Sequence, residues 1–217
     1  MSRLSRGLLV AFLLAALVDL GSLLAGVHAG HQVAKPLLMP LLAAYAATRS
    51  APKPLLAALL CGWAGDVFLM ADADGAFLVG MGCFAAGHLC YLFLFGRRRT
   101  SPLLGLVYGV VLGVTVTALW PGLPDGLRVP VAGYSLLLTA MAYRSSSLGV
   151  MTGIGGALFL LSDTLIATGI ADRPQLPAPD FWVMLTYIAA QYLLTEGTLR
   201  ASAMYGECRT RLEPSST

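Results

Sequence analysis

Charged side chains are scarce in this sequence. Asp, Glu, Lys and Arg make up 12% of its 217 residues, whereas an ordinary soluble domain carries about 25%. Hydrophobic residues make up 57%, which excludes a soluble enzyme and a disordered chain. The net charge of +3 comes from basic residues between apolar runs and not from one basic face, so we expect no nucleic-acid partner.

Cysteine is also rare, with four residues in the chain. Cys61, Cys83 and Cys90 lie inside apolar runs, Cys208 lies in a polar tail, and no C-x-x-C pair occurs. This pattern excludes a disulfide framework and predicts free, mostly buried thiols.

Apolar sequence is abundant. Runs too long for strands occupy about residues 7–26, 33–48, 54–71, 76–95, 102–120, 129–143, 148–170 and 181–199. A membrane-spanning helix needs about 20 residues, so eight spans use most of the chain. The sequence therefore predicts an all-α polytopic transmembrane bundle of about eight helices. We expect one integral-membrane domain over residues 1–217, ending in a polar cytoplasmic tail at 201–217.

The first apolar run has two interpretations. Arg3 and Arg6 precede it, and Val27-His28-Ala29 resembles a small-x-small cleavage site, so residues 1–29 could be a signal peptide. The run is longer than the apolar region of about 7–15 residues in such peptides, and Asp19 interrupts it. These features favour an uncleaved helix.

Basic residues are unevenly divided between the two sides of the predicted bundle. With a cytoplasmic N-terminus, 11 of the 14 lie on the cytoplasmic side, namely Arg3, Arg6, Arg49, Lys53, Arg97, Arg98, Arg99, Arg144, Arg200, Arg209 and Arg211. The far side receives Arg128 and Arg173, with the acids Asp72, Asp74, Asp125, Asp172 and Asp180. The positive-inside rule therefore predicts that both termini are cytoplasmic. The Ala, Leu, Gly and Arg bias favours a bacterial cytoplasmic (inner) membrane.

The two halves of the chain share a pattern. LLCGWAGDVFLMA around Asp66 parallels ALFLLSDTLIATG around Asp163, and a similar alignment of the next runs places His88 opposite Gln191. Four helices per half would give both halves the same orientation, which predicts a 4+4 parallel repeat. The second and sixth runs are both short. This feature often marks a binding site in transporters, although short helices also occur where the bilayer is thin.

Polar residues at membrane depth are the candidate functional residues, because a charge there costs at least about 2.5–3.5 kcal/mol. Asp66 and Asp163 are the strongest, since each follows a small residue that would let a substrate approach. The other candidates share the far-side half of the predicted bundle: Lys35 at a helix start, Tyr134 and Tyr187 five or six residues into their helices, and His88 and Gln191 nearer the middle. Each of these could instead have a structural role. Lys35 could reach the membrane interface, His88 could hydrogen-bond two helices together, and Tyr134 and Tyr187 could belong to the interfacial belt of aromatic residues. Asp19 is expected to be structural.

Two carboxyls in an apolar region can divide the roles of acid and base, as in glycoside cleavage. No G-x-S-x-G motif supports a serine nucleophile. A triad would have to use His88, because His28 and His31 are predicted to lie in a loop. Asp66, Asp163 and His88 could bind a metal, but no H-E-x-x-H or Cys/His spacing supports one. We expect no metal or organic cofactor.

Five motifs occur in a specific order. They are KPLLMP (35–40), GDVFL (65–69), GHLCY (87–91), GALF (156–159) running into Ser162-Asp163, and YIAAQ (187–191). Together they resemble the YhhN family, which includes the animal lysoplasmalogenases, over about residues 33–200. The resemblance adds Tyr91 of the third motif to the residues expected to bind substrate.

The resemblance implies a multi-pass membrane enzyme that cleaves the vinyl-ether bond of lysoplasmalogens. The products would be a fatty aldehyde and a glycerophospho-headgroup compound. One of Asp66 and Asp163 would be the general acid, while the other would stabilise an oxocarbenium ion and activate water. Lys35 would bind the phosphate, and the remaining polar candidates would position the substrate. The main alternative is a proton-coupled transporter of a small molecule or lipid that uses the same Asp pair. A structural or sensor protein and a metal-dependent lipid hydrolase are further alternatives.

Overall fold

A computed structural model describes residues 2–71, 73 and 75–212, with side chains up to residue 204. Asp72 and Asp74 of the predicted far-side loop, and the side chains of Cys208, Arg209 and Arg211, lie outside what is described.

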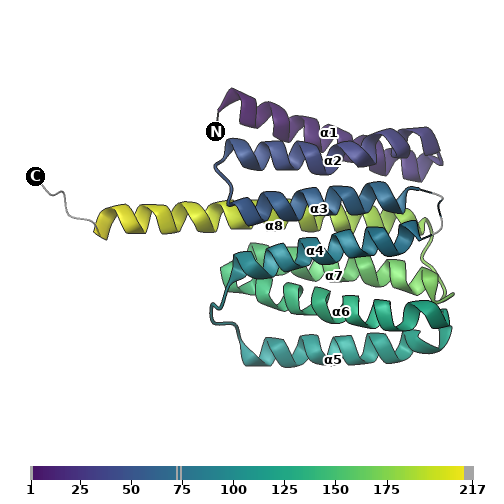
Figure 1. Cartoon of the computed structure of the whole chain (residues 1–217). Helices are drawn as coiled ribbons and strands as arrows, with labels where there is room; N and C mark the ends of the chain where they lie inside the picture. The colour runs from purple at the N-terminus through teal and green to yellow at the C-terminus, as the bar shows by residue number, and fades with distance from the viewer. Residues whose placement is uncertain (1, 72, 74, 213–217) are drawn as a thin grey trace, which may run out of the picture.

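Eight α-helices and two short 3₁₀ turns make up the described chain (Figure 1). They are α1 (Arg3–Ala25), α2 (His28–Thr48), α3 (Lys53–Leu69), α4 (Ala76–Phe95), α5 (Pro102–Leu119), η1 (Trp120–Gly122), α6 (Asp125–Ser145), η2 (Ser146–Leu148), α7 (Val150–Ile170) and α8 (Pro179–Leu212). Successive helices alternate in direction, so both termini lie at one end of the bundle, here called the terminal end. The prediction of an all-helical bundle of about eight helices is confirmed.

Four of these helices are long and apolar enough to cross a membrane by length and composition. They are Arg3–Ala25, Ala76–Phe95, Pro102–Gly122 and Val150–Ile170. α3 has only 17 residues, while α2, α6 and α8 begin with or contain more polar residues. The antiparallel bundle gathers Arg49, the run 97–99 and Arg144 at the terminal end. The chain is an integral membrane protein.

α2 and α6 are longer than the sequence predicts. Each has 21 residues, so the prediction of two short helices in equivalent places is wrong. His28 and His31, predicted to lie in a loop, belong to the first turn of α2. Both α2 and α6 begin with polar residues that are compatible with a helix. Helix starts predicted from apolar runs leave these residues out. Paired short helices therefore no longer favour a transporter.

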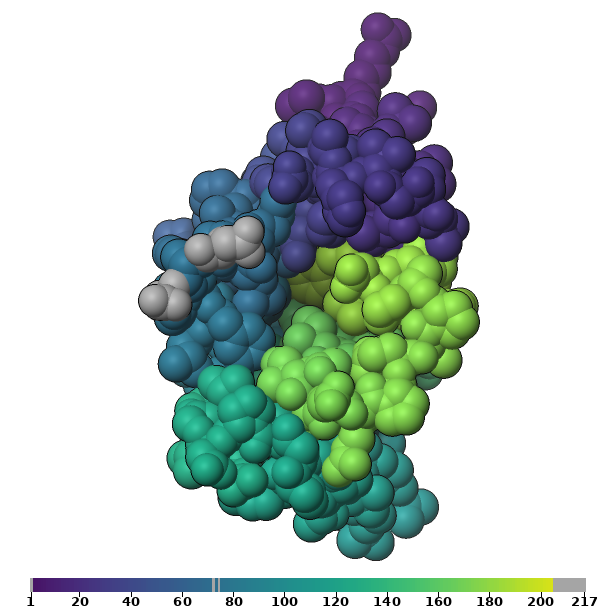
Figure 2. Space-filling model, turned by 90° about the vertical axis from the view of Figure 1, so that its right-hand side faces the viewer, coloured from purple at the N-terminus to yellow at the C-terminus, as the bar shows by residue number. Residues whose placement is uncertain are grey.

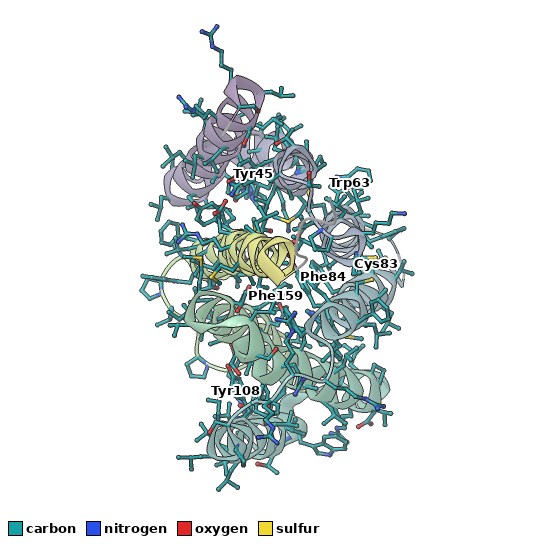
Figure 3. All side chains as sticks on the ribbon, turned by 90° about the vertical axis from the view of Figure 1, so that its left-hand side faces the viewer. Tyr45, Trp63, Cys83, Phe84, Tyr108 and Phe159 are labelled. Carbon is teal, nitrogen blue, oxygen red and sulfur yellow. The ribbon has the colours of Figure 1, made fainter. Side chains whose placement is uncertain are left out.

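α8 also exceeds its predicted range. It continues through the expected polar tail at 201–217 as far as Leu212 and projects beyond the other helices at the terminal end (Figure 1). Viewed along the bundle, α8 lies in the middle, next to Phe84 and Phe159 (Figure 3), and it contacts α1, α2, α3 and α7. At the opposite end, the α7–α8 connection sits between the α1–α2 turn and the α5–α6 region (Figure 2).

The two most extensive helix pairs correspond in the two halves, although α1 packs along α2 more extensively than α5 packs along α6. α3 packs along α4 and α7 along α8, while α2 contacts α3 and α6 contacts α7. Glycines permit these approaches: a Cβ on Gly87 would lie 3.2 Å from the Ala58 carbonyl oxygen, and one on Gly155 would lie 2.9 Å from the Leu194 nitrogen. Small residues commonly pack membrane helices in this way. This order agrees with the predicted 4+4 repeat, which stays a prediction.

The cysteine prediction is confirmed in part. Cys61, Cys83 and Cys90 are free thiols. They are half-buried and not fully buried, because an apolar residue of a membrane helix can face lipid as well as the protein interior. Their position in apolar runs did not distinguish these two surroundings.

Gly65 lies where α3 packs against the ring of Phe84 on α4. A Cβ there would lie 2.6 Å from two ring atoms of Phe84, and this ring is held between Phe159 and Tyr187. We expect Gly65→Ala to lower the free energy of unfolding by about 1–3 kcal/mol, as overpacking does. Thermal unfolding in detergent measures this. Gly82→Ala is the control, since nothing lies within 4 Å of its Cβ position, and equal stability of the two variants would contradict the packing.

Candidate active site

Asp163 of α7 begins the first of two hydrogen-bonded side-chain series. The hydroxyl of Tyr134 on α6 donates to Asp163 Oδ2, and Nε2 of His88 on α4 lies 3.0 Å from that hydroxyl. Because the Tyr134 proton is directed at Asp163, the network assigns a hydrogen to His88 Nε2. Nδ1 is then an acceptor, and it is buried without a partner among the described residues. It is an unused acceptor in the protein core, because His88 is only 1% exposed.

Asp66 of α3 begins the second series. The Tyr187 hydroxyl on α8 donates to Asp66 Oδ2 at 2.8 Å, and Gln191 Nε2 donates to the same hydroxyl at 3.4 Å. Gln191 Oε1 accepts from the Tyr91 hydroxyl on α4 at 2.7 Å. A Cβ on Gly62 would lie 3.1 Å from Gln191 Nε2 and 3.2 Å from the Tyr187 hydroxyl. The absence of a side chain at Gly62 thus makes room for this series.

Aromatic rings connect the two series. Phe159 packs edge-on against His88, at 4.8 Å between ring centroids, and against Tyr187, at 5.5 Å. Charges also act between the series: Asp66 lies within electrostatic range of Asp163, and Lys35 within range of Asp66. The bundle thus brings all eight predicted site residues into one region.

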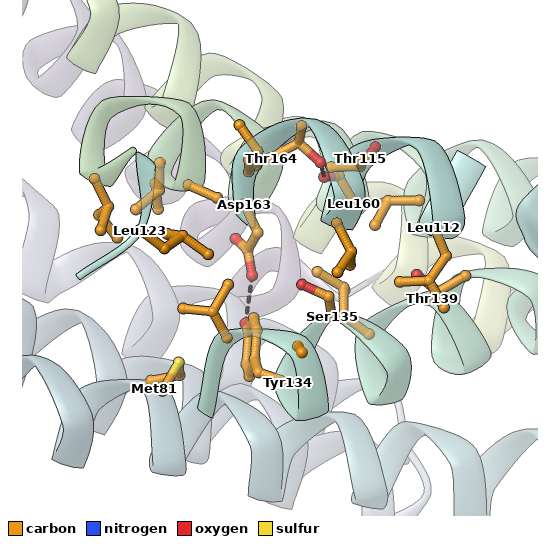
Figure 4. Close-up of a pocket in the computed structure, with 18 of the residues that line it drawn as sticks. Met81, Leu112, Thr115, Leu123, Tyr134, Ser135, Thr139, Leu160, Asp163 and Thr164 are labelled. Carbon is orange, nitrogen blue, oxygen red and sulfur yellow. Dashed lines mark hydrogen bonds between the residues drawn. The ribbon is translucent and has the colours of Figure 1, made fainter. Parts of the chain in front are cut away.

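A pocket opens on one of the two carboxyls (Figure 4). It lies between α4, α5, α6 and α7, and its empty volume, including the open mouth, is about 880 Å³. The bonded pair Asp163 and Tyr134 forms part of its wall, between Leu123 towards one end and Leu112 and Thr139 towards the other. Asp66 does not line the pocket and is only 3% exposed. The two predicted catalytic residues therefore differ in access.

The tyrosine partners of the two carboxyls break the proposed symmetry. In a 4+4 repeat α3 corresponds to α7, and α4 to α8. Asp66 nevertheless takes its tyrosine from α8, whereas Asp163 takes its tyrosine from α6. Phe84 of α4 stands at the position that the alignment pairs with Tyr187. The two carboxyl sites are therefore different, which suits a division of roles.

Three polar groups have structural roles that their positions in the sequence did not indicate. Arg128, assigned to a loop, lies on α6 and lines the pocket. Glu196, overlooked at the end of the last apolar run, is buried and bonded by Tyr45. Asp19 is buried, and His31 Nδ1 lies 2.8 Å from its Oδ1. An acid inside an apolar run was the signal that could have identified Glu196.

Metal ligands do not gather in this region. Across residues 2–71, 73 and 75–204, no three His, Cys, Asp or Glu side chains lie close enough together to hold a metal ion. The arrangement offers two carboxyls, three phenols, an imidazole and an amide, which can transfer protons and position polar atoms.

Similarity to known proteins agrees with the motifs. The model of the YhhN family matches residues 30–198. The human protein named lysoplasmalogenase TMEM86B is 37% identical over 141 residues, which cover 65% of this chain and 61% of that protein. Its pig counterpart is 40% identical over 136 residues, covering 62% and 58%. Cattle lysoplasmalogenase TMEM86A is 32% identical over 145 residues, covering 60% and 58%.

These alignments extend over 58–61% of the relatives' own lengths. No solved structure matches the chain. The family match includes every predicted site residue, from Lys35 to Gln191. The chain belongs to the YhhN family.

Proposed function

We propose that this protein hydrolyses the vinyl-ether bond of lysoplasmalogens. The observation that carries the proposal is a carboxyl, Asp163, in the wall of an otherwise mostly apolar pocket, with a second buried carboxyl within electrostatic range. Such a pocket can hold a lipid chain with its ether beside an acid. The names of the relatives point to the same substrate class.

Asp163 is the general acid in this proposal, because it alone of the two carboxyls lines the pocket. It transfers its proton to the outer alkene carbon of the vinyl ether, which leaves an oxocarbenium ion. Water then adds to the carbon next to the ether oxygen and loses a proton. The resulting hemiacetal collapses to a fatty aldehyde and the free glycerol hydroxyl. General acid catalysis of this kind contributes about 10²–10⁴-fold to a rate.

Asp66 is the second carboxyl. In its ionised form it stabilises the oxocarbenium ion through space. Because Asp66 does not line the pocket, the proton released by the attacking water returns to the Asp163 carboxylate, which restores the acid. Tyr187, Gln191 and Tyr91 hold it in place through their hydrogen bonds. His88 does not line the pocket, and its Nδ1, buried without a partner among the described residues, accepts a hydrogen bond from a water molecule in the core while its Nε2 positions Tyr134. No step in this scheme needs a metal or organic cofactor.

The remaining predictions concern topology and location. The terminal end, with its basic residues, faces the cytoplasm by the positive-inside rule. The whole chain then forms one membrane domain with the pocket mouth near Arg128 on the far side. The composition favours a bacterial inner membrane. The predicted phosphate-binding role of Lys35 has weaker support, because Lys35 does not line the pocket and its charge acts on Asp66 and Asp19.

The test uses purified protein in detergent and three lysolipids with the same headgroup. One carries a vinyl ether, one a saturated ether and one an acyl ester. We expect aldehyde from the vinyl ether alone, with no loss on adding a chelator. Loss on chelation would favour a metal-dependent hydrolase instead. Folded protein that releases no aldehyde but takes up substrate with protons into vesicles would be a transporter.

A further inference from the structure

We propose that Arg128 binds the phosphate of a single-chain lysolipid whose hydrocarbon chain occupies the pocket between α4, α5, α6 and α7. The identity of the lipid rests on the proposed function. The phosphate site itself rests on the position of Arg128, which is the only basic residue among those that line the described pocket.

Arg128 is held loosely at the mouth. Its Nε donates to the Leu123 carbonyl at 3.2 Å, and its Nη1 lies 2.5 Å from Asp125 Oδ1. The Arg128 side chain is 33% exposed and the Asp125 side chain 89%. An ion pair with such an exposed carboxylate contributes little. A phosphate oxygen can replace Asp125, because the planar guanidinium binds phosphate through two parallel hydrogen bonds.

The spacing along α6 suits a lysolipid. Arg128 and Tyr134 are six residues apart, which is a rise of about 9 Å. In the lipid, only the glycerol carbons and their oxygens separate the phosphate from the ether. A phosphate on Arg128 therefore places the ether near Tyr134 and Asp163. The hydrocarbon chain continues past them towards Leu112 and Leu138, deeper in the pocket.

The rest of the lining fits this occupant. Towards the mouth, Trp120 and Leu119 of the α5–η1 junction line the pocket, and α5 contributes Val111, Leu112 and Val116 deeper in. These apolar side chains can pack against one hydrocarbon chain, while Arg128 can pair with one negatively charged phosphate. A neutral single-chain lipid would use the apolar wall but gain nothing from Arg128.

The experiment compares two substrates that differ only in phosphate. Aldehyde release is measured from a lysoplasmalogen and from the corresponding 1-alkenylglycerol. For Arg128→Met we expect KM to rise about 10- to 100-fold for the lysoplasmalogen, the range for losing hydrogen bonds to a charged group, and to change little for the alkenylglycerol. Arg128→Lys should restore part of the loss, because it restores the charge without the paired geometry.

Two matched variants sharpen the comparison. Arg173→Met removes another Arg at the same end, one that donates to the Ala118 carbonyl and does not line the pocket. We expect it to leave both KM values unchanged. Lys35→Met should change both substrates alike, since its charge acts on Asp66. Equal effects of Arg128→Met on the two substrates, or a phosphate-dependent effect of Lys35→Met in its place, would overturn the assignment.

A binding measurement separates this proposal from the enzymatic one. Trp120 lines the pocket, so a nitroxide-labelled lysophosphatidylcholine should quench its fluorescence, with Trp120→Phe as the control for Trp63 and Trp182. We expect Arg128→Met to raise the concentration of this lipid needed for half-maximal quenching at least tenfold. The concentration of a labelled alkylglycerol needed should not change. If the native protein releases no aldehyde and still shows this difference, the proposed function fails and the phosphate site stands. If both lipids quench native protein and variant equally, the phosphate site fails.

Discussion

Asp163→Asn is expected to lower kcat for vinyl-ether hydrolysis by about 10²–10⁴-fold, the usual contribution of a general acid. Asn has the size of Asp, and its amide oxygen can still accept the hydrogen bond from Tyr134. The substitution therefore removes the transferable proton and leaves the pocket wall in place. KM should change much less than kcat, because Asp163 acts mainly after the lipid has bound.

Two further carboxyl variants make this result specific. Asp66→Asn should also lower kcat, since Tyr187 can still donate to it while the negative charge is lost. Asp19→Asn is the control, because Asp19 is an acid buried like Asp66, lies beside His31 and does not line the pocket. We expect it to keep kcat within a few-fold. Full activity of folded Asp163→Asn, measured as aldehyde release per mole of protein, would refute the mechanism.

Glu196→Ala is expected to cause the largest loss of stability. Glu196 is 5% exposed on α8 and joins α8 to α2 near the terminal end. Tyr45 donates to its Oε1, Arg49 Nη1 lies 3.4 Å from the same oxygen, and Arg200 Nε lies 3.6 Å from Oε2. Removing one partner of a buried ion pair costs about 3–5 kcal/mol. Because Arg49 is 27% exposed, we expect about 2–4 kcal/mol.

Thermal unfolding in detergent checks this expectation. In a chain of this length each kcal/mol lowers Tm by about 2–4 °C. Glu196→Gln should cost less, since its amide oxygen still accepts from Tyr45. Asp180→Ala is the control, because this exposed acid in the first turn of α8 contributes about 0.3–1 kcal/mol through the helix dipole. A Glu196→Ala variant as stable as Asp180→Ala would show that the cluster does not hold α2 to α8.

Apolar runs predicted the number and order of the helices because a segment that crosses the membrane needs about 20 predominantly apolar residues. They misplaced the start of α2, where His28 and His31 are polar but helical, and the end of α8, where the helix continues in polar sequence. An apolar run records an apolar environment, which is either lipid or the protein interior. Helix ends depend on backbone hydrogen bonds, which such a run does not record.

The sequence predicted which residues form the candidate site, but not how they are paired. Depth along the helices was enough to group Asp66 and Asp163 with their polar neighbours, because each residue advances the helix by a fixed rise. The pairing of Tyr187 with Asp66 and of Tyr134 with Asp163 depends on how each helix is rotated, and no single sequence specifies that rotation. Access to the pocket, which distinguishes Asp163 from Asp66, depends in the same way on side chains from four helices.

The central position of α8 has a consequence for how the protein is made. Ribosomes synthesise chains from the N-terminus, and early segments begin to fold before later ones exist. The helix that fills the middle of this bundle, in contact with α1, α2, α3 and α7, emerges after the seven other helices. Until it arrives, Asp66 lacks the Tyr187 hydroxyl and Tyr91 lacks Gln191. The polar network therefore closes only after α8 has joined helices that were made before it.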